Sequence, residues 1–591
     1  MSASVPTNGS RRLARLTSMQ PLTAELLGPE PVELALAGAR RRCEVGDLVR
    51  LDDSTPPRIA ERIAKTDSAL ARIVALAAGE GLDPAFSEEV EEEARKLEAD
   101  SGIDDPKLKD YTGLAFVTID DEHSRDLDQA VQVERRGDGH LVRYALADAA
   151  HFVRPGTALH DEALRRGASY YLPSFVVPML PRRLCEDLIS LNPKVDRRAL
   201  VFEIELDADG LVSDTRVLRA RIHSRAKLSF ERVQSLYDDR RRGAFRDRDV
   251  QESLLALEEV GRRRQALAAE RGVVRYRRQE LDVSLKGAES PRFVAGSELR
   301  LGVERHNEQV SLLCNIEGAR LLRAHDRGDD DAMQPIYRTH APPEEGKLRR
   351  FTSLLGRVRR ERRLDPKVWT WRRREGQSLS DFLAALPHDG EEGRVAKAIN
   401  RQALMTNGRS TFGTLPADHF GVGAEVYARF SAPMREIVGV FLHAELLESL
   451  DRRRRKRKPT RADVALQERV VEIANQSKDL QRKLTRAANR LVLDDVLGHL
   501  GRDRLVGTVM GLTRSKVHVL LDDPPLDVKA YRRDLERGGR KCRLARSGVA
   551  LLDARGRRVL ALGDRVSVGV AGRDAQRDRW RLSVRRAKST D

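Results

Sequence analysis

The chain has 591 residues, and its 108 lysines and arginines outnumber its 91 aspartates and glutamates, which gives a formal net charge of +17. This basic excess favours nucleic acid or an anionic membrane surface as a partner. No apolar run approaches the ~18 residues needed to span a bilayer, and the N-terminus lacks a secretory apolar core, so we expect a cytoplasmic protein without a membrane partner. The four cysteines form no Cys-x-x-Cys pair, so neither a zinc site nor a disulfide framework is indicated.

The N-terminal part of the chain predicts a tail, a barrel and a linker. At about 150 residues per domain, the length corresponds to three to four domains. Residues 1–20 are rich in Ser, Thr, Asn and Arg, and we expect them to be disordered. Residues 21–80 contain short alternating runs with a turn at Gly46, which predicts a small β-barrel. The charged run Glu88 to Glu98 predicts a helix in a linker over residues 81–104.

Residues 105–500 mix strand and helix patterns, which is typical of an α+β domain. Leu141 to Ala149 and Leu200 to Leu206 have the apolar character of strands. Glu252 to Arg271 and Glu308 to Arg323 have the spacing of amphipathic helices. We therefore expect one mixed domain over this range.

A basic connector and a helix end this range. Arg452 to Lys458 contains only arginine and lysine, and it predicts either a solubilising linker or a contact with phosphate. Thr460-Arg-Ala-Asp463 has the character of a capping box, and helical periodicity continues from there to about Leu500.

The tail, residues 501–591, alternates with a period of two. Leu505 to Leu512, Lys516 to Leu521 and Trp580 to Val584 are examples of these strand-like runs. Short strands with glycine turns in a basic context predict an OB barrel, a common binder of single-stranded RNA. A structural barrel without a ligand is the alternative, but the arginines favour RNA binding.

Three carboxylates lie close together in the middle of the chain. Asp120, Asp126 and Asp128 follow the strand-like run Leu114 to Ile119 within nine residues. Such carboxylates repel each other unless a positive charge lies among them, and a hard divalent cation prefers oxygen ligands. A solvated acidic turn is the alternative. An acidic cluster inside a strongly basic chain favours a metal site beside a polyanion.

The run Thr118-Ile-Asp-Asp-Glu-His-Ser-Arg-Asp-Leu-Asp-Gln-Ala130 resembles the metal motif of the ribonuclease II/R family, the RNB exoribonucleases. That motif reads T-I-D, followed after five residues by D-x-D-D-A. Further segments are similar to the family's later motifs and occur in the family's order. They are residues 171–184, 188–193, 226–233, 336–340 and 419–435. The resemblance covers about residues 105 to 500.

The resemblance implies an α+β multidomain protein with a cold-shock-like OB barrel, an RNB catalytic domain and a C-terminal OB barrel. It further implies 3′→5′ hydrolysis of single-stranded RNA to nucleoside 5′-monophosphates with Mg²⁺. We also expect a monomer, and, because a neutral amide stands at one motif position, an activity that needs more Mg²⁺ or prefers Mn²⁺. The chemistry of the residues agrees with this expectation. Phosphodiester hydrolysis needs an activated water and relief of negative charge, and two cations ~4 Å apart provide both.

By resemblance, Asp120 and Asp126 are expected to bind metal. Asp128 is expected to bridge or position metal and water, and to be the residue that is hardest to replace. Gln129 stands at the family's fourth aspartate. Its amide oxygen is expected to be a poorer Mg²⁺ ligand than a carboxylate.

Three more residues have roles implied by the resemblance. Arg435 is expected to neutralise the scissile phosphate, because a guanidinium binds paired oxygens in a bidentate way. Tyr171 is expected to stack on a base near the RNA 3′ end, unless it is a core residue and Tyr170 is the exposed tyrosine. His419 is expected either to contact the phosphate path or to be a buried structural histidine.

The chain departs from the family pattern beyond Gln129. Glu436 and Ile437 stand where the family has Arg or Lys and then Tyr, Gly439 replaces a later Asp, and Thr485 replaces a Glu. These departures leave two alternatives to an active enzyme. One is an RNB-fold protein that binds RNA but cleaves it slowly or not at all. The other, from an unrelated class, is an OB-rich translation or ribosome-assembly factor.

Overall fold

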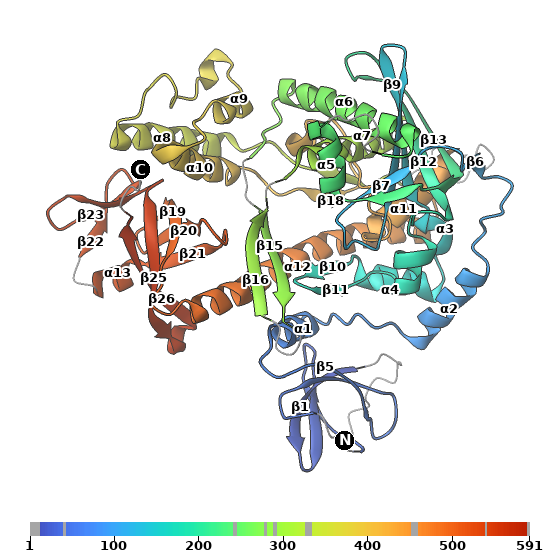
Figure 1. Ribbon diagram of the computed structural model, residues 1–591, viewed down its shortest axis with the longest axis horizontal. Coiled ribbons are helices and arrows are strands. Elements are labelled where there is room, and N and C mark those ends of the chain that lie inside the picture. Colours follow the sequence, from blue (N-terminus) through green and yellow to red (C-terminus); the bar gives the residue numbers. More distant parts are fainter. Residues whose placement is uncertain are drawn as a thin grey trace. The chain divides into compact units, whose positions relative to one another are not determined.

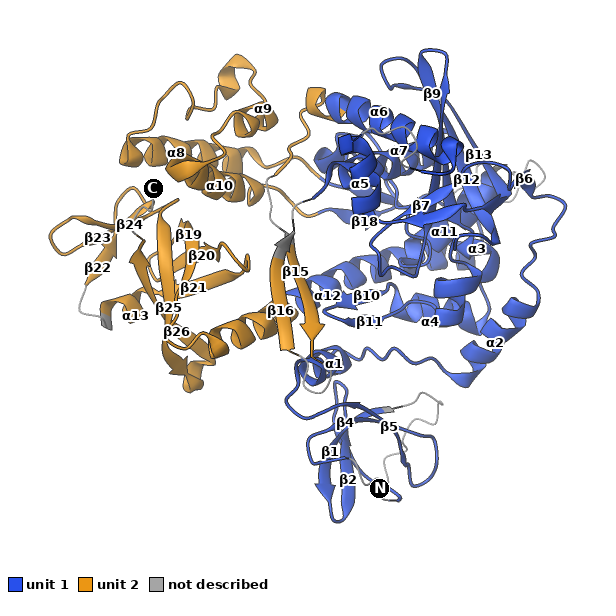
Figure 2. Cartoon of the chain, in the orientation of Figure 1, with its two compact units in different colours: residues 1–267, 300–340, 410–486 blue, residues 268–299, 341–409, 487–591 orange. Residues whose placement is uncertain are grey.

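The structure is a computed structural model (Figure 1), and it describes residues 12–38, 43–239, 245–276, 280–287, 292–298, 300–325, 334–450, 459–537 and 541–587. The basic connector Arg452 to Lys458 therefore lies outside the described residues, as do residues 1–11. The chain divides into two compact units (Figure 2). The first comprises residues 1–267, 300–340 and 410–486, and the second comprises residues 268–299, 341–409 and 487–591.

The first unit begins with five antiparallel strands in the order β3-β2-β1-β4-β5, the strand order of an OB fold. These elements are β1 (Arg12–Met19), β2 (Leu22–Leu26), β3 (Val32–Ala35), β4 (Leu48–Leu51), β5 (Ile59–Ala64) and the following helix α1 (Ala69–Gly79). Val74 and Ala78 of α1 pack against Leu13 and Leu48 of the sheet. The predicted N-terminal barrel is thus confirmed.

The predicted disordered tail over residues 1–20 is wrong for residues 12–19, which form β1 at the centre of this sheet. Leu13, Ala14 and Leu16 are at most 4% exposed. Their arginine, serine and threonine neighbours dominate the composition of the segment and hide its apolar positions. Pairing with both β2 and β4 supplies the backbone hydrogen bonds that an isolated strand lacks.

The central sheet of the first unit has seven strands in the order β14-β7-β8-β9-β12-β13-β6. They are β6 (Lys109–Tyr111), β7 (Val117–Ile119), β8 (Gln129–Arg136), β9 (Gly139–Ala147), β12 (Asp196–Leu206), β13 (Val212–His223) and β14 (Ala226–Leu228). Two short pairs accompany it: β10 (Tyr170–Leu172) with β11 (Phe175–Val177), and β17 (Tyr337–Thr339) with β18 (Thr411–Gly413). Every residue of β9 is buried, so this sheet lies inside a mixed α+β domain, as predicted.

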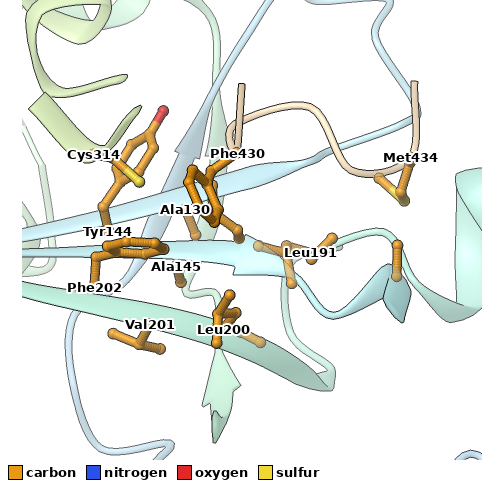
Figure 3. Close-up of a cluster of buried hydrophobic side chains, with 14 of the residues drawn as sticks. Ala130, Tyr144, Ala145, Leu191, Leu200, Val201, Phe202, Cys314, Phe430 and Met434 are labelled. Carbon is orange, nitrogen blue, oxygen red and sulfur yellow. The ribbon is translucent and has the colours of Figure 1, made fainter. Parts of the chain in front are cut away.

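Helices complete this domain and its core. They are α2 (Glu88–Ala99), α3 (Ala149–Phe152), α4 (Ala158–Arg166), α5 (Phe230–Asp239), α6 (Arg248–Glu270), α7 (Gly302–His325) and α11 (Ile437–Leu450). The predicted linker helix is α2, and its Val90 belongs to the same core as the sheet. Figure 3 shows Tyr144, Phe202 and Phe430 in this core. The rings of Phe202 and Phe430 meet edge to face with centroids 5.7 Å apart, a favourable arrangement for aromatic pairs.

The second unit combines helices with the C-terminal barrel. Its helices are α8 (Glu345–Arg362), α9 (Leu379–Ala384), α10 (Gly390–Leu404) and α13 (Arg532–Arg537). The barrel strands β19 (Leu505–Leu512), β20 (Lys516–Leu521), β21 (Asp527–Tyr531), β25 (Arg565–Asp574) and β26 (Arg579–Arg586) follow the order β21-β20-β19-β25-β26. This unit also contains the hairpin β15 (Glu280–Lys286) and β16 (Arg292–Glu298), and a sheet of β22 (Cys542–Leu544), β23 (Ala550–Asp553) and β24 (Arg558–Ala561). The predicted C-terminal OB barrel is confirmed.

One long helix, α12 (Arg461–His499), confirms the helix predicted after the basic connector. Its start is a reciprocal capping box: the Thr460 hydroxyl accepts from the Asp463 N–H at 3.2 Å, and the Asp463 carboxylate accepts from the Thr460 N–H at 2.7 Å. In the described part of the chain, no helix is both long and apolar enough to cross a membrane.

Candidate active site

The connection between β7 and β8 carries the three predicted carboxylates. Asp120 follows β7 directly, and its carboxylate accepts hydrogen bonds from the Ser124 hydroxyl and the Asp121 N–H, both at 2.9 Å. Asp128 precedes β8, and its backbone carbonyl accepts from the Ala147 N–H of β9 at 2.8 Å. The two strands therefore fix both ends of the connection.

Side chains from elsewhere in the fold hold the middle of this connection. The Lys227 ammonium on β14 donates to the carbonyls of Glu122, at 2.7 Å, and Ser124, at 2.5 Å. The Ser190 hydroxyl donates to the Arg125 carbonyl at 2.8 Å and accepts from the Leu127 N–H at 3.0 Å. Neither Lys227 nor Ser190 was predicted from the sequence as a site residue. Their only signal was membership of the two short segments that resemble later family motifs.

Asp128 and Arg435 form the centre of the site. The Asp128 carboxylate is 1% exposed; one oxygen accepts from the Met434 N–H at 2.9 Å, and the other accepts from the Arg435 guanidinium. Burial raises the pKa of Asp128 to about 6, and the Asp126 charge adds to this, while Arg435 acts in the opposite direction.

Arg435 interacts with the whole cluster. Burial lowers the pKa of this guanidinium, but the charges of Asp128, Asp126 and Asp120 outweigh burial, so the net pKa is raised. The structure therefore brings the three predicted carboxylates and the predicted arginine into one electrostatic group, with the guanidinium as their counter-charge.

Tyr171 is the exposed member of its tyrosine pair. Its side chain lies on β10, the residue is 42% exposed, and its hydroxyl donates to the Asp126 carboxylate at 2.5 Å. Tyr170 is 2% exposed and donates to the Arg166 carbonyl at 3.1 Å. Successive strand residues point to opposite sides, so the alternative that Tyr171 is the core residue is wrong.

Gln129 has protein partners at both ends of its amide. Its oxygen accepts from the Tyr144 hydroxyl at 2.7 Å, and its nitrogen donates to the Ser431 carbonyl. The amide thus ties β8 to the segment that leads to Arg435. A role for Gln129 as a metal ligand stays a prediction, and these contacts give it no support.

His419 is buried, 8% exposed, with its ring 5.3 Å from that of His340 and 5.0 Å from that of Tyr427. Burial, Arg338 and His340 lower its pKa to about 4. The imidazole is therefore neutral at pH 7 and has no charge to attract phosphate. This favours the structural alternative for His419.

The segment before Arg435 is anchored in the core. Phe430 and Met434 lie on this segment (Figure 3) and are at most 1% exposed. The buried amide of Asn315 on α7 accepts from the N–H groups of Phe430, at 2.7 Å, and Ser431, at 3.0 Å, and donates to the Ser431 hydroxyl at 2.9 Å. Asn315 was not predicted from the sequence, because its only signal there is an amide inside a helix with apolar periodicity.

The donor set has the chemistry of a hard-cation site, because carboxylate oxygens are the ligands that Mg²⁺ prefers. Among the residues that the structure describes, however, no three His, Cys, Asp or Glu side chains are arranged to hold a metal ion. Instead, Tyr171 binds Asp126 and Arg435 binds Asp128. The residues thus fit a divalent cation in type and charge, although each of the three carboxylates accepts a hydrogen bond from a protein donor.

Comparisons with known proteins agree with this picture. The chain is 29% identical over 430 residues to Ribonuclease R of Vibrio cholerae, which covers 70% of this chain and 47% of that protein. It is 27% identical over 558 residues to Ribonuclease R of Escherichia coli, which covers 91% of this chain and 64% of that protein. The chain thus spans about half to two thirds of the length of these relatives.

Solved structures show the same fold. Mycoplasma genitalium RNase R in complex with ribose-methylated single-stranded RNA matches with a TM-score of 0.79 at 20% identity, covering 99% of this chain and 91% of that one. Yeast Ssd1, a pseudonuclease, matches with a TM-score of 0.62 at 15% identity, covering 94% and 68%. The model of the RNB domain matches residues 108–452, more than half of the chain. An unrelated OB-rich factor is therefore excluded, and the chain belongs to the RNB family.

Proposed function

We propose that the chain is a 3′→5′ exoribonuclease that hydrolyses single-stranded RNA to nucleoside 5′-monophosphates with Mg²⁺ or Mn²⁺. One observation carries the proposal: Asp126, Asp128, Arg435 and an exposed Tyr171 meet at one place in an RNB fold. The names of the relatives, Ribonuclease R, support the same activity. We further propose a cytoplasmic monomer.

Each residue has a chemical task in this proposal. Asp120, Asp126 and Asp128 would hold a divalent cation, which would supply positive charge and lower the pKa of a water molecule. Arg435 exchanges its carboxylate partner for the scissile phosphate and offsets the charge that develops there. Tyr171 stacks on a base near the 3′ end, a contact worth ~1–3 kcal/mol. Its hydrogen bond to Asp126 links the position of that base to the carboxylates.

A labelled-RNA experiment tests the proposal. A 5′-labelled single-stranded RNA is incubated with the protein in Mg²⁺, in Mn²⁺ or in EDTA. We expect a shortening ladder and nucleoside 5′-monophosphates with either metal, and intact RNA in EDTA. Arg435→Ala is the negative control for a contaminating nuclease. RNA that stays intact with Mg²⁺ and with Mn²⁺ would overturn the proposal.

A second candidate is an RNB-fold protein that binds RNA without cleaving it. The observation in its favour is that Arg435 and Tyr171 occupy oxygens of Asp128 and Asp126, while Gln129 is bound to Ser431. The likeness to Ssd1 agrees with this candidate at the level of the fold. Binding of the labelled RNA without any ladder is the outcome that distinguishes it from the enzyme.

A further inference from the structure

Glu436, the residue directly after Arg435, is a buried anion with two cationic partners. Its side chain is 11% exposed, and one carboxylate oxygen lies 3.2 Å from Arg429 Nε and 2.9 Å from Lys478 Nζ. Burial opposes the charged form of Glu436, but Arg429, Lys478 and the nearby Arg338 outweigh it and lower the pKa of this carboxyl to about 2. The carboxylate is therefore ionised at neutral pH.

The backbone around Glu436 joins the arginine segment to the tyrosine strand. Residues 168 and 436 form an isolated β-bridge. On either side of it, the Arg435 carbonyl accepts from the Ser169 N–H at 2.9 Å, and the Gly167 carbonyl accepts from the Ile437 N–H at 3.0 Å. Tyr171 follows two residues after Ser169, so a shift of Glu436 moves both Arg435 and the start of β10.

Two side chains of α12 bind the residues at this junction. Lys478 binds Glu436, and three residues further along the helix the Gln481 amide accepts from the Tyr171 N–H at 3.3 Å and donates to the Tyr171 carbonyl at 3.2 Å. Gly167 has a φ of +71°, and a Cβ added there would collide with the Ser477 hydroxyl. Only glycine allows this close approach in this conformation.

We propose that Glu436 is a positioning residue: its ion pairs with Arg429 and Lys478 fix the spacing between the Arg435 guanidinium and the Tyr171 ring. The scissile phosphate would then bind Arg435 while a base near the same RNA end stacks on Tyr171, with the distance between these two side chains held constant. The inference rests on the proposed function and deepens it. It also gives a task to a residue that the sequence analysis treated only as a departure from the family pattern.

Three full-length variants test this role. Glu436→Gln keeps the shape and removes the charge, Glu436→Asp restores the charge, and Lys478→Met removes the α12 partner. Glu203→Gln is the matched control, because Glu203 is similarly buried at 16% side-chain exposure and binds Arg143 at 2.9 Å and the Tyr111 hydroxyl at 3.0 Å. Measurements are kcat and KM on a short RNA, the affinity for that RNA in EDTA, and the melting temperature.

We expect Glu436→Gln to lower kcat about ten- to a hundred-fold, as a displacement of about 1 Å at a reacting group does. Glu436→Asp should recover most of this loss, and Lys478→Met should lower kcat less, because Arg429 still binds Glu436. Glu203→Gln should lower the melting temperature and leave kcat, KM and the RNA affinity unchanged. If Glu436→Gln lowers only the melting temperature and keeps kcat and affinity, its role is structural and the proposal is overturned.

The affinity measurement separates this inference from the proposed function. If the wild type degrades no RNA, the nuclease proposal fails, but a weaker affinity of Glu436→Gln for the short RNA in EDTA still supports positioning. If the wild type is active and Glu436→Gln matches it in kcat and in affinity, the positioning role fails and the nuclease proposal stands.

Discussion

Among single residues, Asp128 is 1% exposed and its carboxylate binds the Arg435 guanidinium directly. We expect Asp128→Asn to lower the rate of RNA hydrolysis by about 10²-fold or more, because it removes one of the carboxylates proposed to hold the divalent cation. The RNA affinity should change little, since the basic surface is untouched. Parallel rate and binding measurements on one RNA check this. Equal losses in both would assign Asp128 a structural task.

Glu436 should make the stability of the protein depend on pH in a defined direction. Its pKa is lower in the folded protein than in the unfolded chain, so its ion pairs stabilise the fold above the ordinary pKa, and this stabilisation is lost as the pH falls toward 2. Lowering a pKa from about 4.3 to about 2 corresponds to roughly 3 kcal/mol. We expect Glu436→Gln to lower the free energy of unfolding by up to that amount at pH 7.

The pH series of urea unfolding checks this expectation. The gap in unfolding free energy between wild type and Glu436→Gln should narrow as the pH is lowered below about 4.3. A gap that stays constant down to pH 3 would show that the lost charge is not the cause of the destabilisation.

At Gln129 the contacts in the structure lead to a different expectation from the one that the sequence suggests. From sequence, an acid at this position should strengthen metal binding. In the structure the amide nitrogen donates to the Ser431 carbonyl, and a carboxylate there would leave two acceptors facing each other, at a cost of about 1–3 kcal/mol. We expect Gln129→Glu to lower both the melting temperature and the rate. A Mg²⁺ titration of wild type and variant distinguishes the two expectations: half-maximal activity at lower Mg²⁺ in the variant would support the metal-ligand role.

At the scale of elements, the strand β10 presents Tyr171 outward and α12 holds its backbone. Tyr171→Ala should weaken binding of short RNAs more than of long ones and change the length of the final product, because it removes a base-stacking platform. Tyr171→Phe keeps the ring and loses only the hydrogen bond to Asp126, so it should bind short RNAs like the wild type. Anisotropy titrations and product sizing measure both. Equal behaviour of the two variants would exclude stacking.

The same elements show what sequence can and cannot predict here. The start of α12, the C-terminal barrel and the N-terminal barrel apart from β1 were predictable, because capping and period-two alternation are local signals. The carboxylates and Arg435 were identified by motif. Asn315, Lys227 and Gln481 were not, because their partners lie far away in sequence: Gln481 and Tyr171 are 310 residues apart. Only the folded chain brings such groups together.

At the scale of the whole molecule, the chain carries a net charge of +17, which favours binding of RNA. The C-terminal barrel has a candidate surface for this contact. On the outer side of β20 and β21, Lys516 lies opposite Tyr531 and His518 opposite Lys529. Three cations surround the Tyr531 ring; the nearest is Arg579, 4.2 Å from the ring centroid. Cations beside an aromatic ring are typical of surfaces that bind single strands.

Deletion of the whole barrel would not test this surface alone. Met510 of β19 shares a buried core with Val395 of α10, so the deletion would also expose apolar side chains of the helices. Substitution of the surface charges avoids exposing that core. The double variant Lys516→Gln/Lys529→Gln should bind RNA more weakly, and the slope of log affinity against log salt should become shallower by about 0.7 for each phosphate that the variant no longer neutralises.

A control with the same charge change makes the comparison specific. The double variant Lys96→Gln/Arg216→Gln removes two cations whose side chains are 73% and 70% exposed in the first unit. It lowers the net charge equally, so a general loss of attraction would alter both double variants alike. We expect the salt slope of this control to match the wild type, because a slope counts counterions released where the protein meets phosphate and not the total charge. If both variants keep the wild-type slope, the barrel surface does not contact RNA.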